Sequence, residues 1–397
     1  MTSGAVSFAT YADALESGAD IPASLRTADG RDLTPYQVLR MLVPRHELRQ
    51  RGTFFTSTDM ASGLWRSALE SVEDNAIVVD PACGAGDLLL PMALHAASSG
   101  LNVTIRACDI DPHFTQIARS RLEKVLDGGG GLVEGQVRDF TTDTDALSDA
   151  THVVLNPPFV PMVVETDWAS GAVNAASWFV IRALGAMKPG SRLLAVLPDV
   201  LRSGSRYEAW RAAVQRLGKV TSVQALGVFD TDTDVHVFTL DVIAGDTGAS
   251  VGWVESKVSE FTLGDLVDVR VGPVVPHRDP EIGALVEFIT ARSLSAGVVQ
   301  QRRYSGRLEI GPMVLVNRTS RPGETPRVRA RFRESQTATA IENHLLVVIP
   351  KDPVATPFAE LLRVLQSPST AHFLDSRIRC RHLTVKALKE IPWDDNA

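Results

Sequence analysis

Asp80, Gly84 and Gly86 lie in a stretch of the chain that could bind a small molecule. Residues 76–87 read AIVVDPACGAGD, an apolar run that ends on a carboxylate and continues into a glycine-rich turn. The apolar run predicts a strand buried on both faces, and the turn predicts the start of a helix. Glycines permit backbone conformations that side chains forbid and let the chain approach a ligand closely. Such a loop at a helix N-terminus can cradle a ligand, although a plain tight turn has the same composition.

A second stretch, Asn156-Pro157-Pro158-Phe159, follows 76 residues after Asp80. Residues 151–155 (THVVL) predict another central strand that runs directly into it. The two prolines have no amide hydrogen, and they fix a rigid, extended corner at the carboxyl end of this strand. Ligands of open α/β sheets bind at that edge. Asn-Pro-Pro-Phe alone could be a simple loop corner, but together with the glycine loop it favours a binding site.

The elements that must position these two stretches alternate between strands and helices. Strands are predicted at 103–109, 132–137, 192–198, 220–226 and 235–243, and helices at 87–98, from Pro112, at 174–187 and at 207–217. The last two strands would form a hairpin at the end of the series. This alternation predicts an α/β fold with a mostly parallel sheet.

Length and composition are those of an ordinary globular protein with room for two domains. The chain has 397 residues, of which 44% are hydrophobic and 22% charged. We find no stretch long enough to span a membrane and no secretory signal. The three cysteines, Cys83, Cys108 and Cys380, form no C-x-x-C pair, so neither a disulfide framework nor a metal site is expected. The expected location is a reducing cytoplasm.

Charge is distributed unevenly along the chain. The net charge is −7, but residues 270–397 contain 19 lysines and arginines against 13 acidic residues and therefore carry +6, which leaves −13 on residues 1–269. Such an asymmetry often marks the part of a protein that meets a polyanion. In the stretch 327–333, arginine occupies every second position, so a strand would put all four arginines on one face. That face would be either solvated or in contact with phosphates.

The glycine loop and Asn156-Pro157-Pro158-Phe159 resemble motifs I and IV of the S-adenosylmethionine-dependent amino-methyltransferases, most closely the adenine-N6 DNA methyltransferases. Residues 51–61 (RGTFFTSTDMA) resemble motif X of that family. Motif X, cofactor loop, Asn-Pro-Pro-Phe and then a recognition domain is the order of the gamma class. The resemblance is specific over about residues 50–245, and segments 343–350 and 381–392 are more loosely similar to target-recognition domains.

This resemblance implies a Rossmann-like seven-stranded methyltransferase sheet with a second, C-terminal α+β DNA-recognition domain. It implies an N-terminal helical extension at residues 1–50, a methyltransferase domain at 51–270 and a target-recognition domain at 271–397. The apolar positions of the N-terminal extension could cap the core of the methyltransferase domain.

The resemblance also implies which residues hold the cofactor, S-adenosylmethionine. They are Thr56, Asp80, Ala82, Cys83, Gly84, Gly86, Asp109, Ile110, Asp139 and Phe140. Thr56 would bind the methionine carboxylate, and Asp109 would accept the ribose hydroxyls. Asp139 would accept a hydrogen bond from the adenine amine of the cofactor, and Phe140 would pack against its ring. A surface aspartate beside a core phenylalanine is the simpler interpretation of the last two residues.

By the same resemblance, Asn156, Pro157, Pro158 and Phe159 form the catalytic segment. The exocyclic amine of adenine is a poor nucleophile because its lone pair is delocalised into the ring. The side-chain oxygen of Asn156 and the carbonyl of Pro157 would accept its hydrogens and aim the lone pair at the methyl group. The target base would leave the duplex and stack on Phe159. Most relatives have tyrosine here, and phenylalanine keeps the stacking face without the hydroxyl.

The expected partner is double-stranded DNA, contacted through Arg318, Arg327, Arg329, Arg331 and Arg333. The resemblance places this activity in restriction-modification or phage defence, where a separately encoded restriction or defence subunit is a further expected partner. The alternatives are an RNA methyltransferase that acts on guanine N2 or adenine N6, a protein-glutamine methyltransferase, and a non-catalytic DNA-binding subunit. The basic C-terminal part disfavours a protein substrate, and an N4-cytosine enzyme would typically have serine at position 156.

Overall fold

The chain forms two compact units. The computed structural model describes residues 7–44, 46–48, 56–127, 129–230, 233–254, 259, 261–379 and 381–393. The first unit comprises residues 1–201 and 208–251, and the second comprises residues 202–207 and 252–397. Among the described residues, no helix has both the length and the apolar character needed to cross a membrane.

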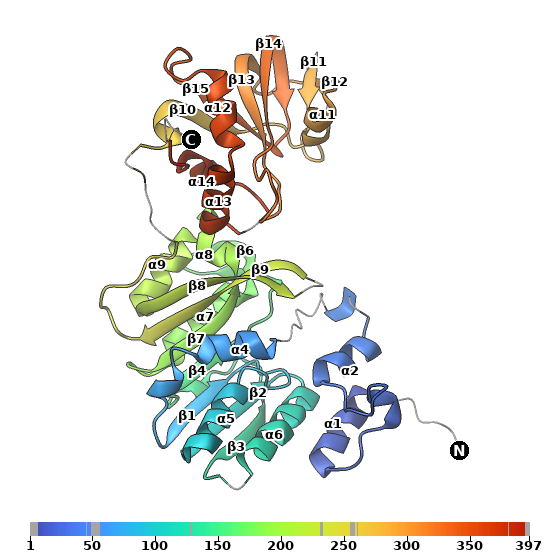
Figure 1. Ribbon diagram of the computed structural model, residues 1–397, viewed down its shortest axis with the longest axis vertical. Coiled ribbons are helices and arrows are strands. Elements are labelled where there is room, and N and C mark those ends of the chain that lie inside the picture. The colour runs from blue at the N-terminus through green and yellow to red at the C-terminus, as the bar shows by residue number, and fades with distance from the viewer. Residues whose placement is uncertain are drawn as a thin grey trace. The chain divides into compact units, whose positions relative to one another are not determined.

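The first unit is built on a seven-stranded sheet whose strands follow the order β3-β2-β1-β4-β7-β9-β8 (Figure 1). Their bounds are β1 Ala76–Asp80, β2 Val103–Asp109, β3 Leu132–Val137, β4 His152–Leu155, β7 Arg192–Pro198, β8 Gly218–Asp230 and β9 Thr233–Ala244. Strands β3, β2, β1, β4 and β7 are parallel, whereas β9 runs antiparallel to both β7 and β8. This is the predicted Rossmann-like seven-stranded α/β sheet.

Helices cover both faces of this sheet. The helices of the first unit are α1 Phe8–Ser17, α2 Pro35–Leu42, α4 Thr58–Trp65, α5 Leu90–Ser99, α6 Pro112–Leu126, α7 Ala175–Ala186, α8 Asp199–Ser203, which ends in the second unit, and α9 Glu208–Leu217. Figure 1 shows α4, α5 and α6 in front of the sheet, and their apolar side chains share one buried cluster with β1, β2 and β7. Helices α7 and α9 pack against each other and against β7 and β8.

The N-terminal helices belong to the first unit rather than forming a separate extension. Tyr11 of α1 and Val38 of α2 share a buried cluster with Ala85 of the glycine loop and Ile117 of α6. This packing confirms that the apolar positions of the N-terminal segment cap the core. It also covers one side of the glycine loop.

Two features of the first unit differ from the sequence-based prediction. Helix α5 begins at Leu90 and not at residue 87, because residues 84–89 form turns and Pro91 is tolerated only in the first helical turn. A short hairpin, β5 Pro161–Glu165 and β6 Ser170–Asn174, follows the Asn-Pro-Pro-Phe corner directly and was not predicted. The tip of the β8–β9 hairpin lies outside the described residues.

The second unit is built on a six-stranded sheet with the order β10-β15-β13-β14-β11-β12. Its strands are β10 Val267–Val271, β11 Ala284–Ile289, β12 Gln300–Tyr304, β13 Glu309–Asn317, β14 Ala330–Ile341 and β15 Leu345–Pro350. Its helices are α10 Leu263–Leu266, α11 Ala291–Ala296, α12 Phe358–Leu365, α13 Pro368–Arg377 and α14 Val385–Lys389. Val314 and Val316 of β13 face α12, α13 and α14, whereas Met313 and Leu315 face α11. This is the predicted C-terminal α+β unit.

The boundary at residue 271 that the sequence suggested is wrong by one strand and one helix. Strand β10 pairs along its whole length with β15, so β10 belongs to the second sheet and α10, directly before it, to the second unit. Segment 202–207 also groups with the second unit. The pairing partner of β10 lies about 80 residues further on, and no local pattern in the sequence indicates it.

The alternating arginines do not form one exposed face. Only Arg331 and Arg333 lie in β14, which begins at Ala330. Arg327 is fully buried: its Nε lies 3.0 Å from Asp375 Oδ1, and its Nη1 donates to the Ser320 carbonyl at 2.6 Å. Arg327 is therefore a structural residue that ties the segment before β14 to α13, and it is not placed to meet a phosphate.

The remaining arginines of this stretch stay near the surface but are also engaged. Arg329 pairs with Glu324 at 2.9 Å, and Arg333 pairs with Glu287 at 2.5 Å. Arg331 is exposed. The lack of a shared face follows from the chain path, since Arg327 and Arg329 precede the strand.

We expect Arg327→Ala to destabilise the second unit by at least about 2 kcal/mol, because it leaves Asp375 and the Ser320 carbonyl without their buried partner. Arg331→Ala, a matched change at an exposed position, should change the unfolding free energy by no more than about 0.5 kcal/mol. Urea unfolding monitored by tryptophan fluorescence measures both values. Equal stabilities for the two variants would contradict a structural role for Arg327.

Candidate functional site

The glycine loop begins where β1 ends on Asp80. This carboxylate is 1% exposed, and its Oδ1 accepts a hydrogen bond from the Ala82 amide at 3.0 Å. The loop borders a small hollow of about 30 Å³. The hollow is lined by Thr56, Asp80, Ala82, Cys83, Gly84, Ala85, Asp87, Leu88 and Asn156. The fold thus brings the two stretches singled out in the sequence to one place, together with Thr56.

The two glycines of the loop serve different purposes. Gly84 has φ +51°, and a Cβ atom built on it would have no atom within 4 Å, so the backbone there faces open space that a ligand can approach. Gly86 has φ +81°, and a Cβ on it would lie 3.1 Å from the Ala118 side chain of α6. Gly86 is therefore required by its backbone conformation and by the close approach of α6.

Asp109, at the end of β2, supports the loop from the neighbouring strand. Its Oδ2 accepts from the Gly84 amide at 2.8 Å, and its Oδ1 accepts from the Asp111 amide at 3.0 Å. Burial raises the pKa of Asp109 above its usual value. The next residue, Ile110, is 68% exposed, which is unusual for a large apolar side chain. Asp111 caps α6.

Asn156 follows β4 and meets Thr56, which lies two residues before α4. Asn156 Nδ2 donates to Thr56 Oγ1 at 2.9 Å, and Thr56 is 7% exposed. Because the amide nitrogen Nδ2 is the atom hydrogen-bonded to Thr56, the amide oxygen Oδ1 is the atom on the side of the amide away from Thr56. The next residue, Pro157, is buried. Residues 51–55, the first half of the motif X resemblance, lie outside the described residues.

Phe159 packs with its edge toward Phe229 of β8. The two ring centroids are 5.9 Å apart and the ring planes are inclined by 76°. Phe159 is only partly buried, so part of the ring is accessible beside the Asn156 corner. Pro158 is also partly buried.

Phe140 does not present its ring to a ligand. It is 4% exposed, and its ring lies 5.0 Å from that of Phe179 in α7. The neighbouring Asp139 accepts from the amide of Thr141 at 2.8 Å and from its hydroxyl at 2.6 Å, which closes a local turn. The simpler interpretation, a partly exposed aspartate beside a core phenylalanine, fits this geometry better than ring packing on a cofactor.

Two residues that the sequence did not single out hold the loop in place. Trp65 of α4, fully buried, donates from Nε1 to the Leu88 carbonyl at 2.7 Å. Arg121 of α6 pairs with Asp87 at 2.9 Å and also donates to the Ala85 carbonyl. For the ion pair between Arg121 and Asp87, the sequence shows only opposite charges on two neighbouring segments, and this does not specify a contact.

The electrostatics of the site are dominated by buried acidic groups. Desolvation, together with the nearby carboxylates of Asp109 and Asp87, raises the pKa of Asp80 to about 8. Burial also raises the pKa of the Cys83 thiol well above its usual value, so Cys83 stays protonated at neutral pH and is a poor nucleophile. A bound cation would relieve the unfavourable burial of charge at Asp80.

No protein-family model matches the sequence, and no curated protein matches it. Among solved structures, the fold is similar to a protein from Listeria monocytogenes assigned to the class I S-adenosylmethionine-dependent methyltransferases, with 14% identity and a TM-score of 0.44 over 61% of this chain and 81% of that chain. It is similar to the type IIG restriction endonuclease BpuSI, with 11% identity and a TM-score of 0.47 over 87% of this chain and 60% of that one. It is also similar to the methyltransferase subunit of a type I restriction-modification system from Streptococcus thermophilus, with 18% identity and a TM-score of 0.41 over 49% of this chain and 45% of that one. We therefore base the function on the residues of this chain.

We expect the free energy of unfolding to fall more steeply in the wild type than in Asp80→Asn as the pH rises from about 4 to about 8. The folded protein keeps a proton on Asp80 up to a pKa of about 8, whereas an unfolded aspartate loses it near 3.9. In this window the folded state binds more protons, so stability is lost by up to about 1.4 kcal/mol per pH unit.

Urea unfolding at pH 5.5 and pH 8 measures this difference for both proteins. Burial lowers the pKa of His152 to about 4, which works in the opposite direction, and its effect cancels when wild type and variant are compared. Parallel pH profiles for the two proteins would show that Asp80 titrates normally.

Proposed function

We propose that this chain transfers a methyl group from S-adenosylmethionine to the exocyclic N6 of a flipped-out adenine in DNA. The observation that carries the proposal is the junction of three separate segments. Thr56, the glycine loop after β1 and Asn156 after β4 line one hollow, and Thr56 and Asn156 are joined by a 2.9 Å hydrogen bond. These are the segments that resemble motifs X, I and IV.

The residues around the loop fit the cofactor. S-adenosylmethionine supplies an electrophilic methyl group on a positively charged sulfur. Gly84 leaves open space beside its backbone for close approach, and a cationic ligand would favour ionisation of the buried acidic groups Asp80 and Asp109. Ile110 offers an exposed apolar surface at the end of β2 for an adenine ring. Ala82 and Cys83 line the hollow as small apolar groups.

The Asn156 corner supplies the chemistry at the substrate. In the proposal, Asn156 Oδ1 and the Pro157 carbonyl accept the two hydrogens of the adenine amine and so localise the nitrogen lone pair. This is catalysis by positioning and electrostatics. The rigid corner made by Pro157 and Pro158 keeps both acceptors fixed, so little reorganisation is needed when the base arrives. Phe159 stacks on the extruded base, which an enzyme acting on a duplex base must flip.

Thr56 has a different role in this proposal from the one that the motif resemblance implies. Its hydroxyl accepts from Asn156 Nδ2, so it sets which end of the amide is directed toward the base. An inverted amide would present N–H donors to the amine and lose the interaction. Thr56 is therefore a positioning residue for Asn156.

The second unit provides the DNA-binding surface. Residues 270–397 carry +6, against −13 for the rest of the chain. Arg318, Arg329, Arg331 and Arg333 remain candidates for contact with DNA, whereas Arg327 is buried. The motif resemblance extends the proposal to a role in restriction-modification or phage defence, with cleavage carried by a separately encoded subunit.

We expect Asn156→Ala to abolish methyl transfer while S-adenosylmethionine still binds, because the change removes one acceptor for the amine and leaves the glycine loop intact. Transfer is measured with labelled S-adenosylmethionine and mixed unmethylated duplex DNA, followed by nucleoside analysis. Calorimetry measures cofactor binding. N6-methyladenine that disappears in the variant supports the proposal.

Other products of the same assay would point to the alternatives. Methylated RNA but no methylated DNA would make the chain an RNA methyltransferase. Cofactor binding without transfer to either nucleic acid would favour a non-catalytic subunit.

We expect Thr56→Val to lower kcat about 10- to 100-fold, because a mispositioned hydrogen-bond acceptor costs roughly 1–3 kcal/mol in the transition state. Thr56→Ser keeps the hydroxyl and should retain activity within about threefold. The dissociation constant of S-adenosylmethionine should stay within about twofold in both variants, which calorimetry measures. A Thr56→Val enzyme with weakened cofactor binding and unchanged kcat would instead assign Thr56 to the methionine carboxylate.

A further inference from the structure

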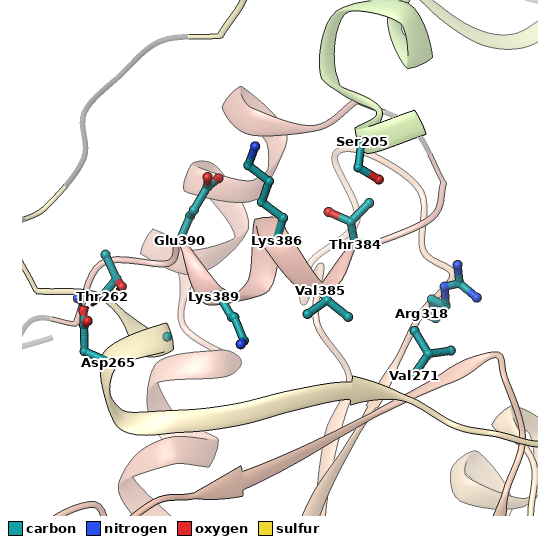
Figure 2. A pocket seen from close by; sticks show the side chains of 11 residues that line it. Ser205, Thr262, Asp265, Val271, Arg318, Thr384, Val385, Lys386, Lys389 and Glu390 are labelled. Carbon is teal, nitrogen blue, oxygen red and sulfur yellow. Dashed lines mark hydrogen bonds between the residues drawn. The ribbon is translucent and has the colours of Figure 1, made fainter. Parts of the chain in front are cut away.

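A hollow of about 700 Å³ on the second unit has no role in the site described above. Its wall includes Arg318 just beyond β13, Lys386 and Lys389 of α14, and Thr384 before that helix. Figure 2 shows the two lysines extending from α14 in different directions, with Arg318 beyond Val385. Three cationic groups are thus spread around one hollow rather than gathered at a single point.

The carboxylates of the hollow are already engaged with the protein. Asp265 accepts from the Thr262 amide at 2.8 Å and from its hydroxyl at 2.9 Å, which caps α10. Glu390 pairs with Arg377 at 2.6 Å. These partners reduce the negative potential that the two carboxylates would otherwise add, so the cations dominate the field of the hollow.

Two of the three basic groups, Lys389 and Arg318, are held in position by their neighbours. Gly264 lets α10 approach α14 so closely that a Cβ atom on it would lie 3.0 Å from Lys389 Cβ. The stem of Lys389 is therefore held against α10, while Lys386 is exposed. Arg318 donates from Nη1 to the Asn343 carbonyl at 3.1 Å, which anchors its half-buried side chain. Anchored cations lose less conformational entropy on binding than flexible surface lysines.

The pKa of His382, two residues before Thr384, is also affected by the positive charges near the hollow. Burial lowers the pKa of His382, and the cationic side chains of Arg318 and Arg381 lower it further. Thr384 adds a polar group of the kind that contacts phosphates, since its Oγ accepts from the Ala387 amide and its own O–H can still donate. Spread cations together with a hydroxyl suit an extended polyanion better than one compact anion.

We propose that this hollow holds the sugar-phosphate backbone of the DNA substrate, with Lys386, Lys389 and Arg318 in contact with successive phosphate groups. The inference rests on the proposed function, because it assigns the backbone of that substrate to a surface. It moves the main phosphate contacts away from residues 327–333, where Arg327 is buried and Arg329 and Arg333 pair with carboxylates. These contacts are independent of sequence and set the position of the duplex.

The test measures how salt weakens binding of the full-length protein to a fluorescein-labelled duplex DNA of about 20 base pairs. Each phosphate contact contributes about 0.9 to the slope of log K against log salt concentration. We expect Lys386→Gln/Lys389→Gln to reduce the steepness of this slope by about 1.8 and to weaken binding roughly 25- to 100-fold at 0.1 M salt. Arg363→Gln, which removes an exposed positive charge from α12, is the matched control and should leave the slope unchanged.

Two competitors decide between possible occupants. A duplex RNA of the same sequence that binds more tightly, with the same dependence on the two lysines, would overturn the assignment to DNA. Tripolyphosphate that displaces the duplex at stoichiometric concentration would show a site for a compact anion and would also overturn it. An unchanged salt slope in the double lysine variant would remove the hollow from the DNA surface.

The same variants separate this inference from the proposed function. At saturating DNA, the double lysine variant should keep the wild-type kcat, because no lysine touches the reacting atoms. Asn156→Ala should keep the wild-type salt slope while losing transfer. If the double lysine variant has the expected shallower slope but the wild-type protein transfers no methyl group, the proposed function is contradicted. If the wild-type protein transfers methyl groups but the double lysine variant has the wild-type slope, only the role of the hollow is contradicted.

Discussion

The site depends on the pairing of β1 with β4 in the middle of a parallel sheet. The chain moves from β1 outward to β2 and β3 and then returns to form β4 on the other side of β1. The loops that leave β1 and β4 therefore turn in opposite directions, and a crevice opens between them at the carboxyl ends of the strands. Asp80 is the last residue of β1 and Asn156 directly follows β4, and their position beside the hollow is a consequence of this topology.

Keeping the loop in place requires support from outside the sheet. An acidic group as buried as Asp80 opposes folding at neutral pH unless it keeps its proton or meets a cation. The neighbouring elements hold the loop despite this cost. Trp65 of α4 and Arg121 of α6 bind its carbonyls, and the N-terminal helices pack against Ala85. A preformed loop can then bind a cationic ligand without first paying for its own ordering.

The second unit shows how the same residue type can serve folding or binding. Arg327 and Arg302 are both buried and ion-paired, so their guanidinium groups bridge segments of the chain. Lys386 and Lys389 lie on a short helix beside a hollow whose carboxylates have other partners. A count of basic residues along the sequence does not separate these two uses. Only the folded chain shows that Arg327 and Arg302 are buried and held in ion pairs.

The sequence by itself indicated most strands and helices of the first unit. Strands β2, β3 and β7 have the predicted bounds. The glycine turn and the proline corner were also predictable, since glycine and proline restrict the backbone locally whatever surrounds them. The seven-stranded α/β plan follows from the alternation of these elements.

Only the tertiary structure decided which residues meet. The hydrogen bond between Thr56 and Asn156 spans 100 positions in the chain, and the ion pair between Arg327 and Asp375 spans 48. The inward direction of Phe140 and the membership of β10 in the second sheet also depend on distant partners. A periodic pattern of apolar residues indicates that one face of a helix or strand is buried, but it does not indicate which element covers that face. That information arises only when elements far apart in the sequence pack together.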